Sequence, residues 1–147
     1  MINFKSARKQ SAQVGRRGEN AACKFLESRG MTILARNWKC RAGELDIVAL
    51  DENELVFAEV KTRSKLDNYL PGANLSDTQK KRIRRGARVY MRKHHIPENI
   101  AVRFDLVEVI HDERKVTDIA LHEKYMTFSG PMRLKTAVNG DILSKVY

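Results

Sequence analysis

The chain has 147 residues, of which 42% are hydrophobic and 31% charged, and its formal net charge is +10. These values fit a globular protein with one modest core, and no apolar run reaches the roughly 18 residues of a membrane span. The polar N-terminus does not resemble a secretory signal, and Cys23 and Cys40 lack zinc-ligand spacing, so we expect a cytoplasmic protein with reduced thiols.

The N-terminal part of the chain is predicted to contain one helix and one strand. Residues 1–12 are polar and basic, which predicts a flexible arm in front of a single domain over residues 13–122. From Gln13 to Arg29 small and apolar residues recur at helical spacing, and Gly30 is placed to end that helix. The sequence MTILARNWK at residues 31–39 predicts the first strand.

The next segment predicts a β-hairpin. Residues 43–50 and 55–61 show alternating side chains, and the polar residues 51–54 between them form a turn. Since successive side chains of a strand point to opposite faces, one face of this hairpin is wholly apolar and must be buried. The apolar face consists of Leu45, Ile47, Ala49, Val56, Ala58 and Val60.

The other face of the hairpin becomes charged toward one end. With a symmetric turn, Asp46 faces Glu59, and Glu44 faces Lys61. Two carboxylates about 5 Å apart repel by roughly 3 kcal/mol at an effective dielectric constant near 20. A divalent cation would offset this repulsion, and ligands that are all oxygen atoms indicate Mg²⁺ or Mn²⁺ rather than zinc. The alternative is a solvated face on which Glu44 and Lys61 form a surface ion pair.

A second helix is predicted after the hairpin. Ser76 followed by Gln79 fits a capping box, and the helix should run to about His94 because Pro97 bars its continuation.

Two further strands are predicted after that helix. Residues 101–110 and 116–122 are rich in strand-forming side chains, whereas residues 123–147 are a C-terminal extension of unknown structure. The order helix, three strands, helix and one or two strands predicts an α/β or α+β domain.

The first helix carries one candidate functional residue. Glu19 lies at the edge of the apolar stripe, beside small residues that would let the helix approach the sheet closely. It is either a carboxylate turned toward the sheet or an ordinary boundary residue paired with Arg16 or Arg17.

Charge is distributed unevenly along the chain. Residues 1–43 carry ten Lys and Arg against two acids, residues 44–62 carry one Lys against six acids, and residues 63–98 carry ten basic residues against three acids. Basic segments on both sides of an acidic one would attract a polyanion and a cation to neighbouring surfaces. A basic surface that only aids solubility is the alternative.

The second predicted helix has a basic stripe opposite its apolar face. Like charges at this spacing destabilise a helix by a few tenths of a kcal/mol per pair unless an anion is bound. No zinc finger, helix-turn-helix or RNP motif accompanies the stripe, which therefore indicates contact with a phosphate backbone rather than with bases. The stripe consists of Lys81, Arg85, Arg88 and Arg92, and Arg63, Lys65 and Arg84 extend it.

Several segments together resemble a known family. An Asp, a turn and then Glu-x-Lys resemble the PD-(D/E)XK nuclease signature, and a helical Glu upstream resembles its archaeal Holliday-junction-resolvase branch. The segments GRRGENAA, ARNWKCRAGELDIVAL, LVFAEVKTR and VRFDLVEV are similar to the YraN family of predicted bacterial endonucleases, over about residues 14–110. The resemblance implies a restriction-endonuclease-like α/β fold, with a central mixed sheet of four to five strands flanked by helices.

The resemblance also implies a metal site and a catalytic lysine. Asp46 and Glu59 would bind Mg²⁺ or Mn²⁺, helped by the Val60 carbonyl and by Glu19 directly or through water. Lys61 would orient or deprotonate the attacking water and offset charge in the transition state.

Further residues are implied around that site. Glu44 would be the partner of Lys61 or a ligand in the outer coordination shell, and Gln79 or Lys80 would contact the scissile phosphate. Asp105 would support the sheet rather than bind the metal.

We therefore expect a metal-dependent, structure-selective DNA endonuclease that acts on branched or damaged DNA and has no membrane partner. Cutting a symmetric junction would require a homodimer. One alternative is a non-catalytic nucleic-acid-binding protein on the same fold. Another is an interaction module whose basic surface meets an acidic protein.

Overall fold

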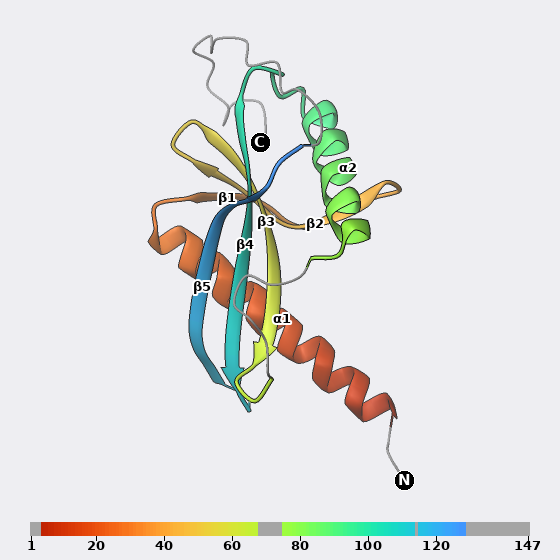
Figure 1. Cartoon of the computed structure of the whole chain (residues 1–147), viewed down its shortest axis with the longest axis vertical. Coiled ribbons are helices and arrows are strands. Elements are labelled where there is room, and N and C mark those ends of the chain that lie inside the picture. Colours follow the sequence, from red (N-terminus) through yellow and green to blue (C-terminus); the bar gives the residue numbers. More distant parts are fainter. Residues whose placement is uncertain (1–3, 68–74, 114, 129–147) are drawn as a thin grey trace.

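The computed structural model describes residues 4–67, 75–113 and 115–128 of the chain. Within these residues the protein forms two helices and five strands (Figure 1). In chain order they are α1 (Phe4–Ser28), β1 (Thr32–Cys40), β2 (Gly43–Asp51), β3 (Glu54–Ser64), α2 (Asp77–Lys93), β4 (Ala101–Asp112) and β5 (Lys115–Met126). Neither described helix is both long and apolar enough to cross a membrane.

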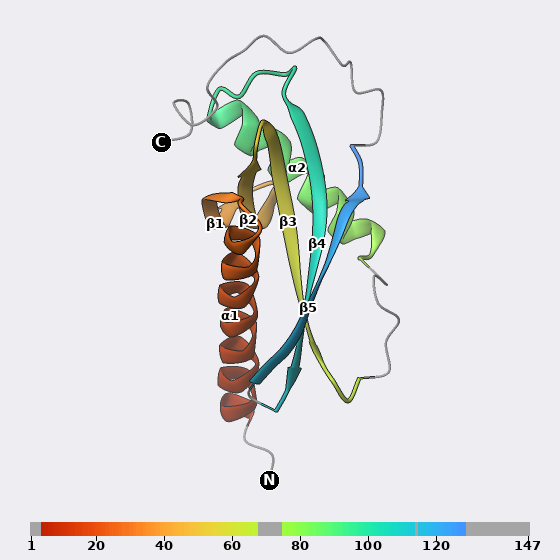
Figure 2. The same ribbon diagram turned by 90° about the vertical axis from the view of Figure 1, so that its left-hand side faces the viewer.

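The strands form one mixed sheet in the order β1-β2-β3-β4-β5. All neighbouring strands are antiparallel except β3 and β4, which are parallel. Parallel neighbours need a crossover connection, and α2 lies in that connection. Figure 2 shows α1 along one face of the sheet and α2 on the other. The predicted α/β fold, a mixed sheet flanked by helices, is confirmed.

Each face of the sheet has its own core. The core on the α1 face joins Ala22, Cys23 and Leu26 of that helix to the sheet. The core on the α2 face is larger and more aromatic, with the Tyr90 ring set edge-on to the Phe57 ring at 6.0 Å between centroids. The strand residues of the α1-face core are Ile47, Ala49, Val56, Ala58, Val107 and Val109.

The first helix and the last strand are longer than predicted, and β3 and β4 also run past their predicted ends, to Ser64 and Asp112. The first helix begins already at Phe4 rather than near Gln13, and the side chains of residues 5–13 are exposed. The last strand, β5, runs from Lys115 to Met126, so the first residues of the predicted C-terminal extension belong to the sheet. The remainder of that extension, from residue 129 on, lies outside the described residues.

The hairpin register is as predicted near the turn, but the alternation of side chains breaks farther down. Val48 pairs with Phe57 as expected. Leu45 was predicted to share the α1 face with Ile47, and this is wrong, because Leu45 belongs to the core on the α2 face. The break occurs opposite Asn37, whose φ of 49° is left-handed and interrupts the period-two pattern.

Gly43 provides a stability prediction for the packing of α2 on the sheet. A Cβ at Gly43 would overlap the backbone carbonyl oxygen of Arg82, which cannot move away as a side chain could. We expect Gly43→Ala to lower the free energy of unfolding by about 2–3 kcal/mol, measured by urea denaturation. The control is Gly15→Ala in α1, where nothing lies within 4 Å and the helix should gain about 1 kcal/mol. Equal stability of Gly43→Ala and wild type would contradict this packing.

Candidate functional site

The candidate site lies where β2 and β3 separate. Their backbone ladder ends at the pair Ile47–Ala58. Beyond that pair, β2 continues only along β1, and β3 continues only along β4. Asp46 and Glu59 are the first residues past the last pair, so their side chains occupy the opening between the two strands.

Side chains take over the contact that the backbones no longer make. The backbone N–H of Val60 donates to Asp46 Oδ2 at 2.9 Å. The carboxyl groups of Asp46 and Glu59 are close enough that each shifts the pKa of the other. The two acidic groups therefore lie side by side, as the hairpin register predicted.

This closeness changes the protonation of the pair. Burial is the main cause that raises the pKa of Glu59 to about 8, and the negative charge of Asp46 adds to it. Burial also raises the pKa of Asp46, although the N–H of Val60 acts against the shift. With its pKa at about 8, Glu59 is protonated at neutral pH, and the proton lessens the repulsion between the two carboxyl groups.

Lys61 and Glu44 add charge to this opening. Lys61 is close enough to favour the ionised form of Glu59, whereas Glu44 disfavours ionisation of both acids in the pair. The prediction that Glu44 faces Lys61 is wrong. The ladder between β2 and β3 ends before this position, and Glu44 pairs with Lys39 of β1 instead.

Glu19 of α1 reaches the same region from the α1 face. Its Oε2 accepts a hydrogen bond of 2.9 Å from Asn37 Nδ2, and its charge raises the pKa of Asp46. The helix comes close because Gly18 packs against Thr62 of β3, where a Cβ would overlap the threonine hydroxyl. Gly18 therefore has the effect expected from the sequence, whereas nothing lies within 4 Å of a Cβ at Gly15.

The oxygen atoms of this pair fit a hard divalent cation. Across residues 4–67, 75–113 and 115–128, no three His, Cys, Asp or Glu side chains converge closely enough to hold one ion. Asp46 and Glu59 would thus supply two side-chain ligands, and Mg²⁺ commonly combines one or two carboxylates with several waters. A cation beside the two carboxylates would offset their mutual repulsion, which adds to the effect of burial in raising the pKa of Glu59.

Two predicted phosphate contacts on the first turn of α2 already have partners. The capping box predicted at Ser76 and Gln79 is present, with Gln79 Oε1 accepting the Ser76 N–H at 3.0 Å. The ammonium of Lys80 lies 5.7 Å from the centre of the Tyr125 ring. The amide oxygen of Gln79 therefore stabilises the start of α2.

The basic stripe of α2 is on the surface, as predicted. Lys81, Arg85, Arg88 and Arg92 are exposed, whereas Ile83, Ala87 and Tyr90 on the opposite side of the helix are buried. The stripe is therefore accessible from the solvent, as contact with a polyanion would require.

Two residues of the predicted extension of the stripe have partners inside the protein, whereas Lys65 is exposed. Arg84 Nε donates to the Thr127 carbonyl at 2.7 Å, and Arg63 Nε donates to Glu108 Oε1 at 3.0 Å.

Sequence reasoning missed the ion pairs of Arg103 on β4. Arg103 is buried and forms ion pairs of 3.0 Å with Asp51, Glu54 and Asp105. Asp105 also accepts the backbone N–H of Lys124, so it supports the sheet as the resemblance implied. These partners come from four different strands, and only the register between distant strands could have identified them.

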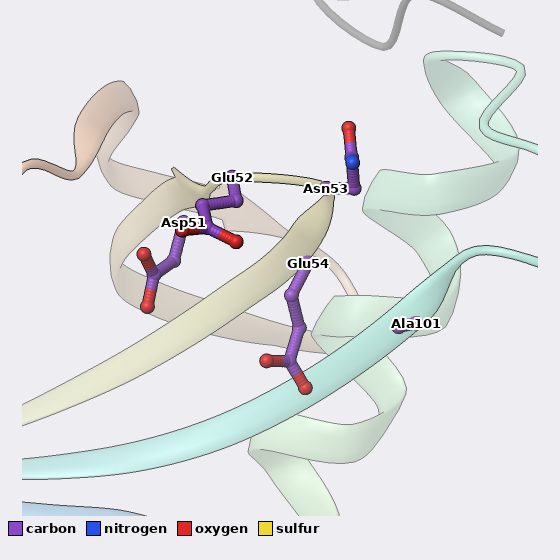
Figure 3. A pocket seen from close by; sticks show the side chains of 5 residues that line it. All are labelled: Asp51, Glu52, Asn53, Glu54 and Ala101. Atoms are coloured by element: carbon purple, nitrogen blue, oxygen red, sulfur yellow. The ribbon is translucent and has the colours of Figure 1, made fainter. Parts of the chain in front are cut away.

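A hollow of about 440 Å³ lies at the turn between β2 and β3 (Figure 3). Its position is about five residues along β2 from Asp46, or roughly 16 Å, so it is separate from the carboxyl pair. Two of its acids, Asp51 and Glu54, are already paired with Arg103. The lining residues are Asp51, Glu52, Asn53, Glu54 and Ala101.

Comparison with known proteins gives a consistent result. Residues 18–109 match the family described as "Uncharacterised protein family UPF0102". A "UPF0102 protein" of Streptomyces griseus is 44% identical over 101 residues, which is 69% of this chain and 85% of that protein. A "UPF0102 protein" of Caldicellulosiruptor bescii is 40% identical over 110 residues, or 74% of this chain and 92% of that protein. The chain belongs to the UPF0102 family.

Proposed function

We propose that this protein is a metal-dependent DNA endonuclease that hydrolyses phosphodiester bonds and prefers branched DNA, as Holliday-junction resolvases do. The proposal also draws on the resemblance of the sequence to the YraN family and to PD-(D/E)XK nucleases. The observation that carries it is the adjacent pair of carboxyl groups of Asp46 and Glu59 in the opening between β2 and β3, with Lys61 beside it. An acidic pair with one raised pKa and a neighbouring cation is typical of catalytic sites.

The residues have separate roles in this proposal. Asp46 and Glu59 hold Mg²⁺ or Mn²⁺, with the Val60 carbonyl as a further ligand and Glu19 acting directly or through water. When bound, the metal would polarise the scissile phosphate and lower the pKa of a water ligand. Lys61 orients the attacking water and offsets the negative charge that develops on the phosphate.

Binding of the substrate is assigned to the surface around α2. Its exposed stripe contacts the phosphate backbone, and because such contacts release counterions, affinity falls steeply with salt. No base-reading element is needed for a nuclease that recognises the shape of a branch rather than a sequence. The stripe consists of Lys81, Arg85, Arg88 and Arg92.

Lys61→Ala tests the chemistry. We expect the rate of Mn²⁺-dependent cleavage of a four-way junction or flap to fall by about 10²- to 10⁴-fold, because the lysine acts on the water in the transition state. Binding of the same DNA in EDTA should change little, since one phosphate contact at most is removed. The measurement is single-turnover cleavage of labelled DNA.

The matched control for that experiment is Lys24→Ala, which removes an exposed lysine from α1. It should cleave at the wild-type rate. Unchanged cleavage by Lys61→Ala, in protein purified identically, would show that the activity does not come from this site.

A non-catalytic nucleic-acid-binding protein is the second candidate. The observation in its favour is that only two acidic side chains converge, so the described part of the chain does not provide a complete set of protein ligands. DNA binding with a steep salt dependence, together with no affinity for Mn²⁺ in calorimetry, would establish this alternative.

A further inference from the structure

Three side chains from three adjacent strands form a second polar cluster. Arg63 of β3 donates from Nε to Glu108 Oε1 at 3.0 Å, and His122 Nε2 of β5 lies 2.8 Å from Glu108 Oε2. The side chain of Glu108 on β4 is 0% exposed, whereas Arg63 and His122 are 21% and 29% exposed. A buried carboxylate therefore anchors one basic group on each of its oxygens, and both basic groups reach the surface.

The cluster lies on the same face of the sheet as Glu59 and Lys61. In the parallel pairing of β3 and β4, Lys61 is opposite Glu108 and Glu59 is opposite Leu106. Leu106 is in turn opposite His122 on β5. Because neighbouring strands are about 4.8 Å apart, His122 is roughly 10 Å from Glu59 across the sheet.

The main contacts of α2 are with β2 and β1, and its Tyr90 ring contacts β3 at Phe57, which lies nearer the β2–β3 turn than Glu59 and Lys61 do. Val107 and Val109, the neighbours of Glu108 along β4, belong to the core on the opposite face, next to α1. Glu108 therefore points to the side from which Glu59 and Lys61 also project.

Burying a carboxylate between strands costs desolvation free energy, so it is not an efficient way to stabilise a sheet. Apolar residues of similar volume often give equal or greater stability, because the charges lose their hydration. What Glu108 provides instead is position, since it fixes the orientation of Arg63 and His122 before any ligand arrives. Receptors whose donors are fixed in advance bind with a smaller loss of side-chain entropy.

His122 has a second ring nitrogen that is suited to a ligand. Nε2 is at Glu108, and no described residue is hydrogen-bonded to Nδ1. A protonated imidazole donates from both nitrogens, so a phosphate oxygen at Nδ1 would supply the second acceptor. Arg63 beside it offers a guanidinium, the group that matches phosphate geometry best.

We propose that Arg63 and His122, held by Glu108, bind the phosphate next to the cleaved phosphodiester and thereby position the DNA strand over Glu59 and Lys61. This inference rests on the proposed function, since it assigns the substrate to that same face of the sheet. His122 and Arg63 are positioning residues in this proposal and take no part in bond breaking.

The test is DNA affinity as a function of salt, without cleavage. Fluorescence anisotropy of a labelled four-way junction is measured in EDTA at about pH 6, between about 50 and 200 mM salt. For His122→Gln we expect the slope of log K against log salt to fall by about 0.9, the loss of one phosphate contact. Arg63→Gln should give a similar decrease, and His122→Arg should restore the wild-type slope.

A matched control is His95→Gln, which removes an exposed histidine after α2 and should leave the slope unchanged. Urea denaturation of each variant establishes that it is folded. If His122→Gln is not folded, His122→Arg, which keeps a donor for Glu108, is measured in its place. If His122 has a purely structural role, neither the slope of log K against log salt nor the DNA affinity will depend on whether residue 122 is charged.

The outcomes separate this inference from the proposed function. If wild type does not cleave DNA but His122→Gln lowers the slope, the phosphate contact stands and the nuclease proposal fails. If cleavage requires Asp46 while His122→Gln and Arg63→Gln both keep the wild-type slope, the nuclease proposal stands and the phosphate contact is overturned.

Discussion

Asp46→Asn is expected to abolish measurable Mn²⁺ binding and to slow metal-dependent DNA cleavage by at least about a thousandfold. A bound metal contributes several kcal/mol to such reactions, and each 1.4 kcal/mol is a factor of about ten. The substitution removes one of the two carboxylates that converge in the opening between β2 and β3. The measurements are isothermal titration with Mn²⁺ and single-turnover cleavage of a four-way junction.

The fold should survive this substitution. An amide oxygen at position 46 can still accept the N–H of Val60, and the amide nitrogen can donate to Glu59. A loss of activity would then report on the metal site rather than on unfolding. Asp118→Asn, at an exposed position of β5, makes the same chemical change away from the site and should bind Mn²⁺ as wild type does. Cleavage that persists in Asp46→Asn would identify a contaminating nuclease.

The second large effect concerns stability and pH. Because the pKa of Glu59 is about 8 in the folded protein against an ordinary value of 4.5, the folded state holds a proton that the unfolded state has already released between these values. Stability of the metal-free protein should therefore fall as pH rises from about 4.5 to about 8 and change little above that. With each pKa unit equivalent to about 1.4 kcal/mol, Glu59 lowers the stability by a few kcal/mol at pH 9.

Glu59→Gln should remove this loss. We expect the variant to be more stable than wild type by a few kcal/mol at pH 9 and to be nearly equal at pH 5, where Glu59 is protonated in the folded protein. The measurement is urea denaturation at several pH values in EDTA. Glu123→Gln, at an exposed position, controls for the change in net charge.

Saturating Mn²⁺ should restore the stability of wild type at pH 9 but not change that of Glu59→Gln, because the ion binds only the folded carboxylate pair. A wild-type stability that is level from pH 5 to pH 9 would contradict the raised pKa of Glu59.

Local patterns were sufficient to predict the carboxyl pair. The register of the hairpin follows from a short turn and from alternating side chains, both of which are properties of neighbouring residues. Asp46 and Glu59 could therefore be placed side by side from the sequence. The position at which the ladder between β2 and β3 ends could not be predicted from the sequence, because it depends on how β3 turns toward β4 and how β2 turns toward β1. Glu44 was placed opposite Lys61 for that reason.

Contacts between distant segments could not be predicted from the sequence. Glu108 and His122 meet Arg63 only through two strand pairings, and the register of neither pairing could be derived from local patterns. The early start of α1 was missed for a different reason. Its first residues have no apolar stripe, but Lys, Ala, Gln and Arg are good helix formers, and the helix continues through them without packing on the sheet.

The separation of β2 and β3 has a consequence for ion selectivity. Since no backbone hydrogen bond joins the strands at Asp46 and Glu59, the gap between the two carboxylates adjusts through side-chain torsions alone. If Asp46 and Glu59 hold a divalent cation as proposed, ions of different radius can be accommodated without breaking the sheet, and discrimination between them would come from the number of waters each retains rather than from a rigid cage.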